Sequence, residues 1–207
     1  MTGQHPATYI MWLLLLIGGA AATFEGSWSV LFIAIATFTL TLIPVLGPGW
    51  TGVRLPSGFV AAVVFFITGT LFLGEVGDFY EHFWWWDILL HAGSAIGFGM
   101  IGTVFVVIMV RGDRLAVSPR IGALLAFSFA VSIGVLWEIF EYSMDQLFGM
   151  NMQKSGLDDT MSDLMVDCVG AGIGAIAGYN YLRGWSDSGL SRTVRVLIDG
   201  LLRRPRP

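Results

Sequence analysis

The sequence predicts an all-α fold, a polytopic transmembrane helical bundle of about six spans followed by a short C-terminal amphipathic helix. One reason is composition: 55% of the 207 residues are hydrophobic and only 13% are charged, whereas soluble domains carry about 25% charged residues. The other is a series of apolar segments near the roughly 20 residues that cross a bilayer. The mean hydropathy of +0.73 agrees, and a soluble protein is excluded.

The predicted spans are residues 9–24, 28–46, 58–74, 87–110, 121–148 and 159–181. No basic residue precedes the first span, so we expect an uncleaved helix and no signal peptide. Pro44, Gly47 and Pro48 end the second span. After the third span, Trp84, Trp85 and Trp86 are typical of a membrane interface. The single cysteine, Cys168, excludes an internal disulfide.

We expect one six-helix membrane domain over residues 1–188 and a basic, cytoplasmic tail over residues 189–207. In the tail, Leu190, Val194, Leu197 and Leu201 form one helical stripe, interrupted by arginines. This pattern is typical of an amphipathic helix on an anionic membrane surface. A frayed basic tail is the alternative.

The basic residues are distributed unevenly between the two sides of a six-span arrangement. Lys154 alone lies on one side, and the other side holds Arg54, Arg111, Arg114, Arg120, Arg183, Arg192, Arg195, Arg203, Arg204 and Arg206. The positive-inside rule therefore predicts a multi-pass membrane protein with both termini in the cytoplasm. Twelve of the fifteen acidic residues fall toward the outer side, which calls for a separate reason.

Acidic residues and one histidine recur at helical spacing in the last three spans. They are Asp87 and His91 in the fourth, Glu138, Glu141 and Asp145 in the fifth, and Asp159, Asp163 and Asp167 in the sixth. Residues three or four apart share a helix face. Ionisable groups inside a membrane indicate a functional site. Small-residue positions, Gly93 with Gly97 and Gly170, Gly174 with Gly178, predict that these helices approach closely.

So many carboxylates cannot all stay ionised in one small site, so either protons or a cation must neutralise them. We predict a divalent cation of unknown identity, held by Asp87, His91, Glu138, Glu141, Asp159, Asp163 and Asp167. Oxygen ligands favour Mg²⁺, Ca²⁺ or Mn²⁺, and the histidine leaves Zn²⁺ or iron open. The alternative for Asp159 is a helix cap. We expect Glu25, Asp78, Glu81 and Asp158 to be solvated loop residues outside the site.

Between about residues 74 and 178 the sequence resembles the YjdF-like family of bacterial inner-membrane proteins. The resemblance rests on Gly74-Glu75, Asp87 with His91 and a following glycine, Glu138-x-x-Glu141, and Asp159-Thr160-x-x-Asp163 before a Gly-Ala run. It implies a small multi-helix membrane protein in which these polar residues, Thr160 included, form a shared set. Asp145 and Asp167 do not match the pattern. The resemblance implies no activity.

Three functions fit this pattern. The first is a metal-dependent membrane hydrolase of a lipid-linked or small extracytoplasmic substrate, with Glu138 and Glu141 as the catalytic carboxylates. The second is a cation- or proton-coupled transporter. The third is a non-catalytic subunit of a larger membrane complex, with a membrane-protein partner. The lipid bilayer is the expected environment in each case, and no nucleic-acid partner is expected.

Overall fold

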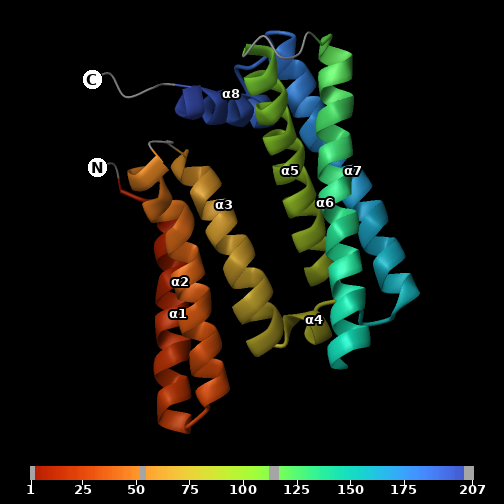
Figure 1. Ribbon diagram of the computed structural model, residues 1–207. Helices are drawn as coiled ribbons and strands as arrows, with labels where there is room; N and C mark the ends of the chain where they lie inside the picture. Colours follow the sequence, from red (N-terminus) through yellow and green to blue (C-terminus); the bar gives the residue numbers. More distant parts are fainter. Residues whose placement is uncertain (1–2, 52–54, 112–116, 203–207) are drawn as a thin grey trace. The chain divides into compact units, whose positions relative to one another are not determined.

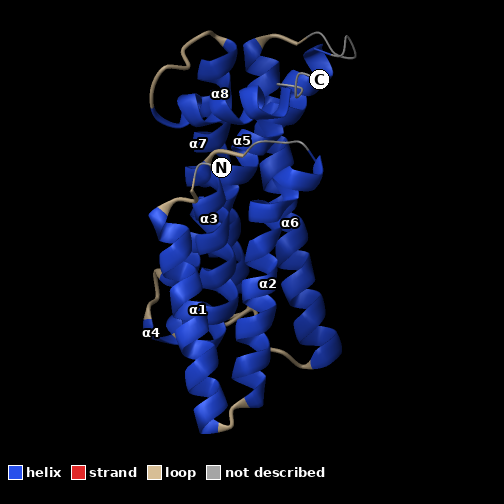
Figure 2. Cartoon of the chain, turned by 90° about the vertical axis from the view of Figure 1, so that its left-hand side faces the viewer, coloured by secondary structure: helices blue, strands red, loops and turns tan. Residues whose placement is uncertain are grey.

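The computed structural model describes residues 3–51, 55–111 and 117–202, and within these ranges the chain is helical without strands (Figure 1, Figure 2). The elements are α1 (Pro6–Glu25), α2 (Trp28–Thr51), α3 (Ser57–Thr68), the π-helix η1 (Gly69–Val76), α4 (Phe79–His82), α5 (Trp86–Arg111), α6 (Pro119–Phe148), α7 (Leu157–Leu182) and α8 (Gly189–Leu202). The all-α fold class is confirmed. Arg54, Arg114, Arg203, Arg204 and Arg206, used above for the orientation, lie outside the described residues.

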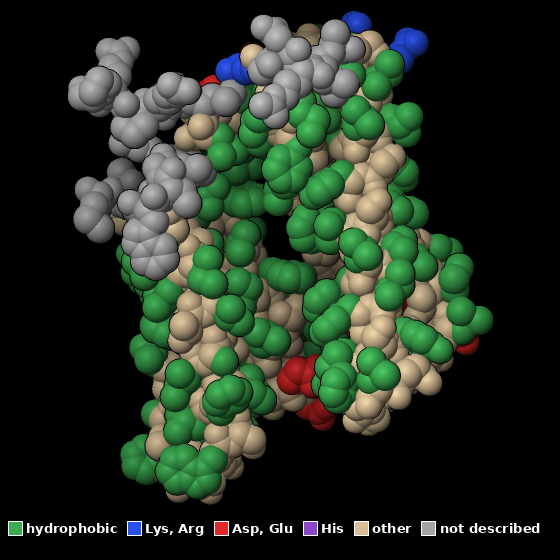
Figure 3. Space-filling model, viewed as in Figure 1, with side chains coloured by type: hydrophobic (Ala, Val, Ile, Leu, Met, Phe, Trp, Pro, Cys, Tyr) green, Lys and Arg blue, Asp and Glu red, His purple; other side chains and the backbone are tan. Residues whose placement is uncertain are grey.

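Among the described residues, six helical segments are long and apolar enough to cross a membrane. They are Pro6–Glu25, Trp28–Gly47, Ser57–Val76, Trp86–Arg111, Pro119–Phe148 and Leu157–Leu182. Each contains one predicted span, and the boundaries differ by only a few residues. Large apolar side chains such as Leu124, Leu136 and Leu147 on α6 are exposed, and apolar side chains cover most of the face drawn in Figure 3. An apolar surface of this extent is expected of helices that face lipid.

Helix α6 shows how local sequence sets the helix ends. The Ser118 side chain accepts a hydrogen bond from the N–H of Ile121, and Pro119 occupies the first turn. Both features are favoured where a helix begins. The helix ends at Gly149, whose φ of 66° lies in the left-handed region that glycine adopts at little cost.

The chain packs as two compact units. The first comprises the described residues of Met1–Trp86 and Asp199–Pro207, and the second is Asp87–Ile198. In the first unit, Leu15 of α1, Ala34 of α2 and Phe72 of η1 form a buried cluster. The Trp86 ring is also buried here, and its N–H donates to the carbonyl of Gly69. Trp86 therefore belongs to the core of this unit, while Trp84 and Trp85 are exposed as expected of interface residues.

In the second unit, glycines let α5 and α7 approach closely. A Cβ at Gly174 would lie 2.5 Å from the carbonyl oxygen of Ile96, and one at Gly99 would lie 2.9 Å from the Cα of Gly174. Gly170 and Gly178 meet α5 in the same way. The prediction for Gly93 and Gly97 is wrong, because a Cβ at either position would meet nothing within 4 Å. Helix α5 faces α7 with Ala92, Ile96 and Gly99.

Helix α8 begins where the tail was predicted to begin, so the frayed-tail alternative is wrong for Gly189–Leu202. Val194, Leu197 and Ile198 are buried, whereas Leu190 is 39% exposed. That the helix lies on an anionic membrane surface stays a prediction. Arg195 forms an ion pair with Asp187, with Nη1 2.7 Å from Oδ1, which ties the helix to the preceding loop.

Candidate functional site

His91 on α5 lies at the centre of a cluster of carboxyl groups from all three long helices of the second unit. Asp87 precedes it by one turn on α5, Glu138 comes from α6, and Asp163 and Asp167 come from α7. His91, Glu138, Asp163 and Asp167 have relative exposures of 8%, 4%, 2% and 2%. Ionisable groups buried to this extent are costly unless they have partners. The cluster therefore needs either internal pairing or a ligand.

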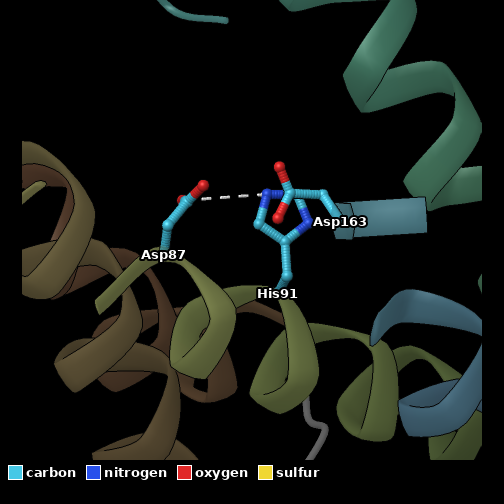
Figure 4. Close-up of side chains that lie close together, drawn as sticks. All are labelled: Asp87, His91 and Asp163. Atoms are coloured by element: carbon cyan, nitrogen blue, oxygen red, sulfur yellow. Dashed lines mark ion pairs between the residues drawn. The ribbon is translucent and has the colours of Figure 1, made fainter. Parts of the chain in front are cut away.

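Both imidazole nitrogens of His91 face carboxylates. The Nδ1 atom lies 3.3 Å from Oδ1 of Asp167. The Nε2 atom lies 3.9 Å from Oδ1 of Asp87 and 4.0 Å from Oε1 of Glu138. Asp163 projects from α7 toward the same imidazole (Figure 4), and Asp87, His91 and Asp163 each offer one ligand atom within 4.8 Å of the others.

Several oxygens of the cluster are buried without a well-formed hydrogen bond to any described residue. They are both carboxyl oxygens of Glu138 and one oxygen, Oδ2, of Asp163 and of Asp167. Thr160 on α7 interacts with the Glu138 side chain and accepts a hydrogen bond from the amide of Gln153. Buried polar atoms are almost always satisfied in proteins. Unsatisfied acceptors that converge on one place therefore point to a missing donor or cation.

Gly134 of α6 lies against the Asp167 carboxyl group. A Cβ at Gly134 would overlap Oδ2 of Asp167, so any larger residue would collide with the carboxyl group. Gly134 is four residues before Glu138 and thus lies on the same helix face. Sequence reasoning missed Gly134, although its spacing from Glu138 was visible.

The remaining acidic residues surround this cluster and have other partners. Glu141 accepts a hydrogen bond of 2.8 Å from the indole N–H of Trp137 and interacts electrostatically with Glu138, Asp87 and His91. Asp159 lies in the first turn of α7 and accepts a hydrogen bond of 3.0 Å from the backbone N–H of Lys154 in the preceding loop. The helix-cap alternative is wrong for this residue, because the N-cap is Gly156 and no described side chain caps the helix. Both residues are only half-buried.

Asp145 organises the loop between α6 and α7 and lies outside the cluster. Its two carboxyl oxygens accept hydrogen bonds from the backbone N–H groups of Met152 and Gln153, at 2.7 and 2.9 Å. In the same loop, Lys154 interacts electrostatically with Asp87 and Asp159. One positive charge is thus near the cluster, which still holds more carboxylates than basic groups.

Glu75, part of the set implied by the resemblance, belongs to the first unit. It is exposed in the π-helix η1. Such π-helical turns occur frequently at functional sites, but the contacts that define the cluster around His91 are all made within the second unit.

The spacing of the cluster fits one bound cation. Two atoms that bind the same ion at about 2.0–2.2 Å can be no more than roughly 4.4 Å apart. The distances from Nε2 of His91 to Asp87 and to Glu138 are below this limit. The ligand atoms of Asp87, His91 and Asp163 all lie within 4.8 Å of one another. To bind one ion, the most distant of them would have to move closer by a few tenths of an ångström. Direct hydrogen bonds, by contrast, would require distances near 3 Å.

Comparisons with known proteins agree with the membrane assignment. A family described as "Predicted membrane protein (DUF2238)" matches residues 6–184, which include all six membrane-length helices. A protein of Thermotoga maritima, described as an uncharacterized protein, is 36% identical over 98 residues, which cover 47% of this chain and 50% of that relative. The chain thus spans about half the length of this relative. No solved structure gives a significant match.

Proposed function

Because the chain belongs to this family of predicted membrane proteins, we propose that it is an integral membrane protein that binds a divalent cation between α5, α6 and α7. The ligands are Asp87, His91 and Asp163, with Glu138 as a fourth. The observation that carries the proposal is the convergence of three ligand atoms within 4.8 Å beside the buried Glu138 carboxyl group, whose oxygens lack a well-formed hydrogen bond to any described residue.

The ligand chemistry narrows the cation. One imidazole and two or three carboxylates suit Zn²⁺, Mn²⁺ or Fe²⁺ better than Ca²⁺, which prefers six to eight oxygen ligands. Three protein ligands would leave Zn²⁺ one coordination position for water or substrate. With Glu138 as a fourth ligand, an open position would require an ion that takes more ligands, such as Mn²⁺ or Fe²⁺. The excess of carboxylates over basic groups in the second unit supports the same conclusion, since an ion would satisfy several of them at once.

We propose further that the site faces the extracytoplasmic side of a bacterial inner membrane. Arg111, Arg120 and Arg183 lie where α5 ends, α6 begins and α7 ends. The three helices alternate in direction across a membrane, so these arginines share one end and the carboxylate cluster lies toward the other. The positive-inside rule assigns the arginine end to the cytoplasm, and with six spans both termini lie there too. We also propose that the chain is a member of the YjdF-like family of bacterial inner-membrane proteins.

The activity we propose is metal-dependent hydrolysis of a lipid-linked or small extracytoplasmic substrate. A divalent ion supplies Lewis acidity and activates water. Glu141 is held by Trp137 at the half-buried edge of the cluster, where it can accept a proton as the general base. Glu138 is the alternative base if it does not bind the ion.

The test is a titration of detergent-purified, chelator-treated protein with Zn²⁺ and with Mn²⁺, followed by calorimetry. We expect saturable binding of one of them in the wild type. Asp163→Asn and His91→Gln should abolish it, whereas Glu25→Gln, an exposed acid at the end of α1, should leave it unchanged. Absence of binding to the wild type contradicts the proposal.

Glu141→Gln separates hydrolysis from the other functions. If the protein is a hydrolase, this variant retains the cation and loses turnover of phosphate- and ester-containing lipid substrates. If the wild type instead carries the cation across proteoliposome membranes, the protein is a transporter. If it binds the cation without turnover or transport, the non-catalytic subunit is favoured.

A further inference from the structure

We propose that Asp167 is a positioning residue that orients His91 and does not bind the cation, and that Gly134 is required because it leaves room for the Asp167 carboxylate. This inference rests on the proposed cation site and assigns Asp167 a role different from that predicted from its spacing. It also gives a role to Gly134, which no carboxylate pattern identifies.

The two nitrogens of His91 serve different partners. Asp167 lies at Nδ1, at 3.3 Å, and Asp87 and Glu138 lie at Nε2, at 3.9 and 4.0 Å. The in-plane directions of the two imidazole nitrogens diverge, so a group at Nδ1 cannot share an ion with ligands at Nε2. The set of mutually close ligand atoms comprises Asp87, His91 and Asp163, so the separation of Asp167 from the ligands rests on its place at Nδ1.

The proton on His91 follows from this arrangement. An ionised carboxylate can only accept hydrogen bonds, so Nδ1–H donates to an ionised Asp167, and Nε2 offers its lone pair when a cation is bound. A neutral imidazole with a free Nε2 lone pair is the form that binds a metal. Histidine ligands of metals nearly always donate their other N–H to a carboxylate or carbonyl group in this way.

Gly134 sets the position of Asp167. Asp167 is 2% exposed, and its Oδ2 occupies the space that a Cβ on Gly134 would need. Two atoms cannot share that space, so Gly134→Ala must push the carboxylate or α6 away. Either movement disturbs the contact between Asp167 and Nδ1 of His91.

The experiment measures the imidazole directly. The chain has three histidines, so a variant carrying His5→Gln and His82→Gln leaves His91 as the single histidine for ¹⁵N-histidine NMR. We expect a proton on Nδ1 in the cation-free protein and coordination through Nε2 when Zn²⁺ is added. Coordination through Nδ1 overturns the inference.

Substitutions in this single-histidine background test each residue. Asp167→Ala should mix the two tautomers and weaken Zn²⁺ binding about 10- to 100-fold. Asp167→Asn keeps a carbonyl acceptor and should retain the tautomer with a smaller loss of affinity. Gly134→Ala should behave like Asp167→Ala. Gly172→Ala is the matched control, because a Cβ there meets nothing within 4 Å, and it should change neither signal nor affinity.

The outcomes separate this inference from the proposed function. If the wild type binds Zn²⁺ and Asp167→Ala and Gly134→Ala bind it equally well with the tautomer unchanged, the roles of Asp167 and Gly134 are wrong and the cation site stands. If no cation binds to the wild type but Asp167→Ala changes the tautomer, the orientation of His91 stands and the cation site is wrong. Circular dichroism melting verifies that each variant is folded.

Discussion

Nδ1 of His91 lies 3.3 Å from Oδ1 of Asp167, although 76 positions separate the two residues in the chain. This contact joins α5 to α7 in the interior of the second unit, at the turn where Gly170 packs against the backbone of α5. The glycine packing and the polar contact therefore depend on each other. If the helices were farther apart, the carboxylate would not reach the imidazole.

Removal of the cation should destabilise the protein. A ligand that binds only the folded state at a concentration of about 100 times its Kd stabilises it by ~2.7 kcal/mol. We therefore expect a chelator to lower the melting temperature by several degrees, and the added cation to restore it. Differential scanning fluorimetry measures this. Glu138→Gln should remove the response, and Glu25→Gln should keep it. Equal melting curves with and without chelator would count against a bound cation.

The orientation predicts which positions are labelled from outside the cell. In a Cys168→Ser background, a cysteine replacing Lys154 should react with a membrane-impermeant maleimide added to intact cells. A cysteine replacing Arg120 should react only after the membrane is permeabilised. The opposite pattern would reverse the orientation and place the carboxylate cluster on the cytoplasmic side.

Gly174→Ala should destabilise the helix pair α5–α7. The added Cβ would lie 2.5 Å from the carbonyl oxygen of Ile96, and overpacking of this kind costs about 1–3 kcal/mol. Gly97→Ala is the control, because its Cβ meets no atom within 4 Å and alanine is favoured over glycine within a helix by about 1 kcal/mol. Unfolding in a denaturing detergent compares the two, and an equal effect of both substitutions would refute the close crossing.

Asp145→Ala should loosen the loop between α6 and α7 without changing cation affinity. The variant loses two hydrogen bonds from Met152 and Gln153, and hydrogen bonds to charged groups contribute about 1.5–3 kcal/mol each. Hydrogen exchange at these two amides should become faster, while the calorimetric titration stays unchanged. A large loss of cation binding would instead make Asp145 part of the site.

Sequence alone predicted the membrane helices well, because apolar segments of spanning length are a strong signal. It also brought Asp87 and His91 near Asp163, because residues four apart share a face and the glycines of α7 indicate close packing. It could not tell which helix face meets which neighbour, so Gly93 and Gly97 were assigned in place of Gly99. For the same reason the role of Gly134 and the separate partners of the two His91 nitrogens became visible only in three dimensions.

The most direct test of the cation site is elemental analysis of the purified protein after dialysis against an equimolar mixture of divalent ions. We expect about one bound transition-metal ion per chain in the wild type and in Glu25→Gln. We expect almost none in Asp163→Asn or His91→Gln, with all four proteins folded by circular dichroism. A wild type without metal, or variants that retain the same amount, would contradict the account.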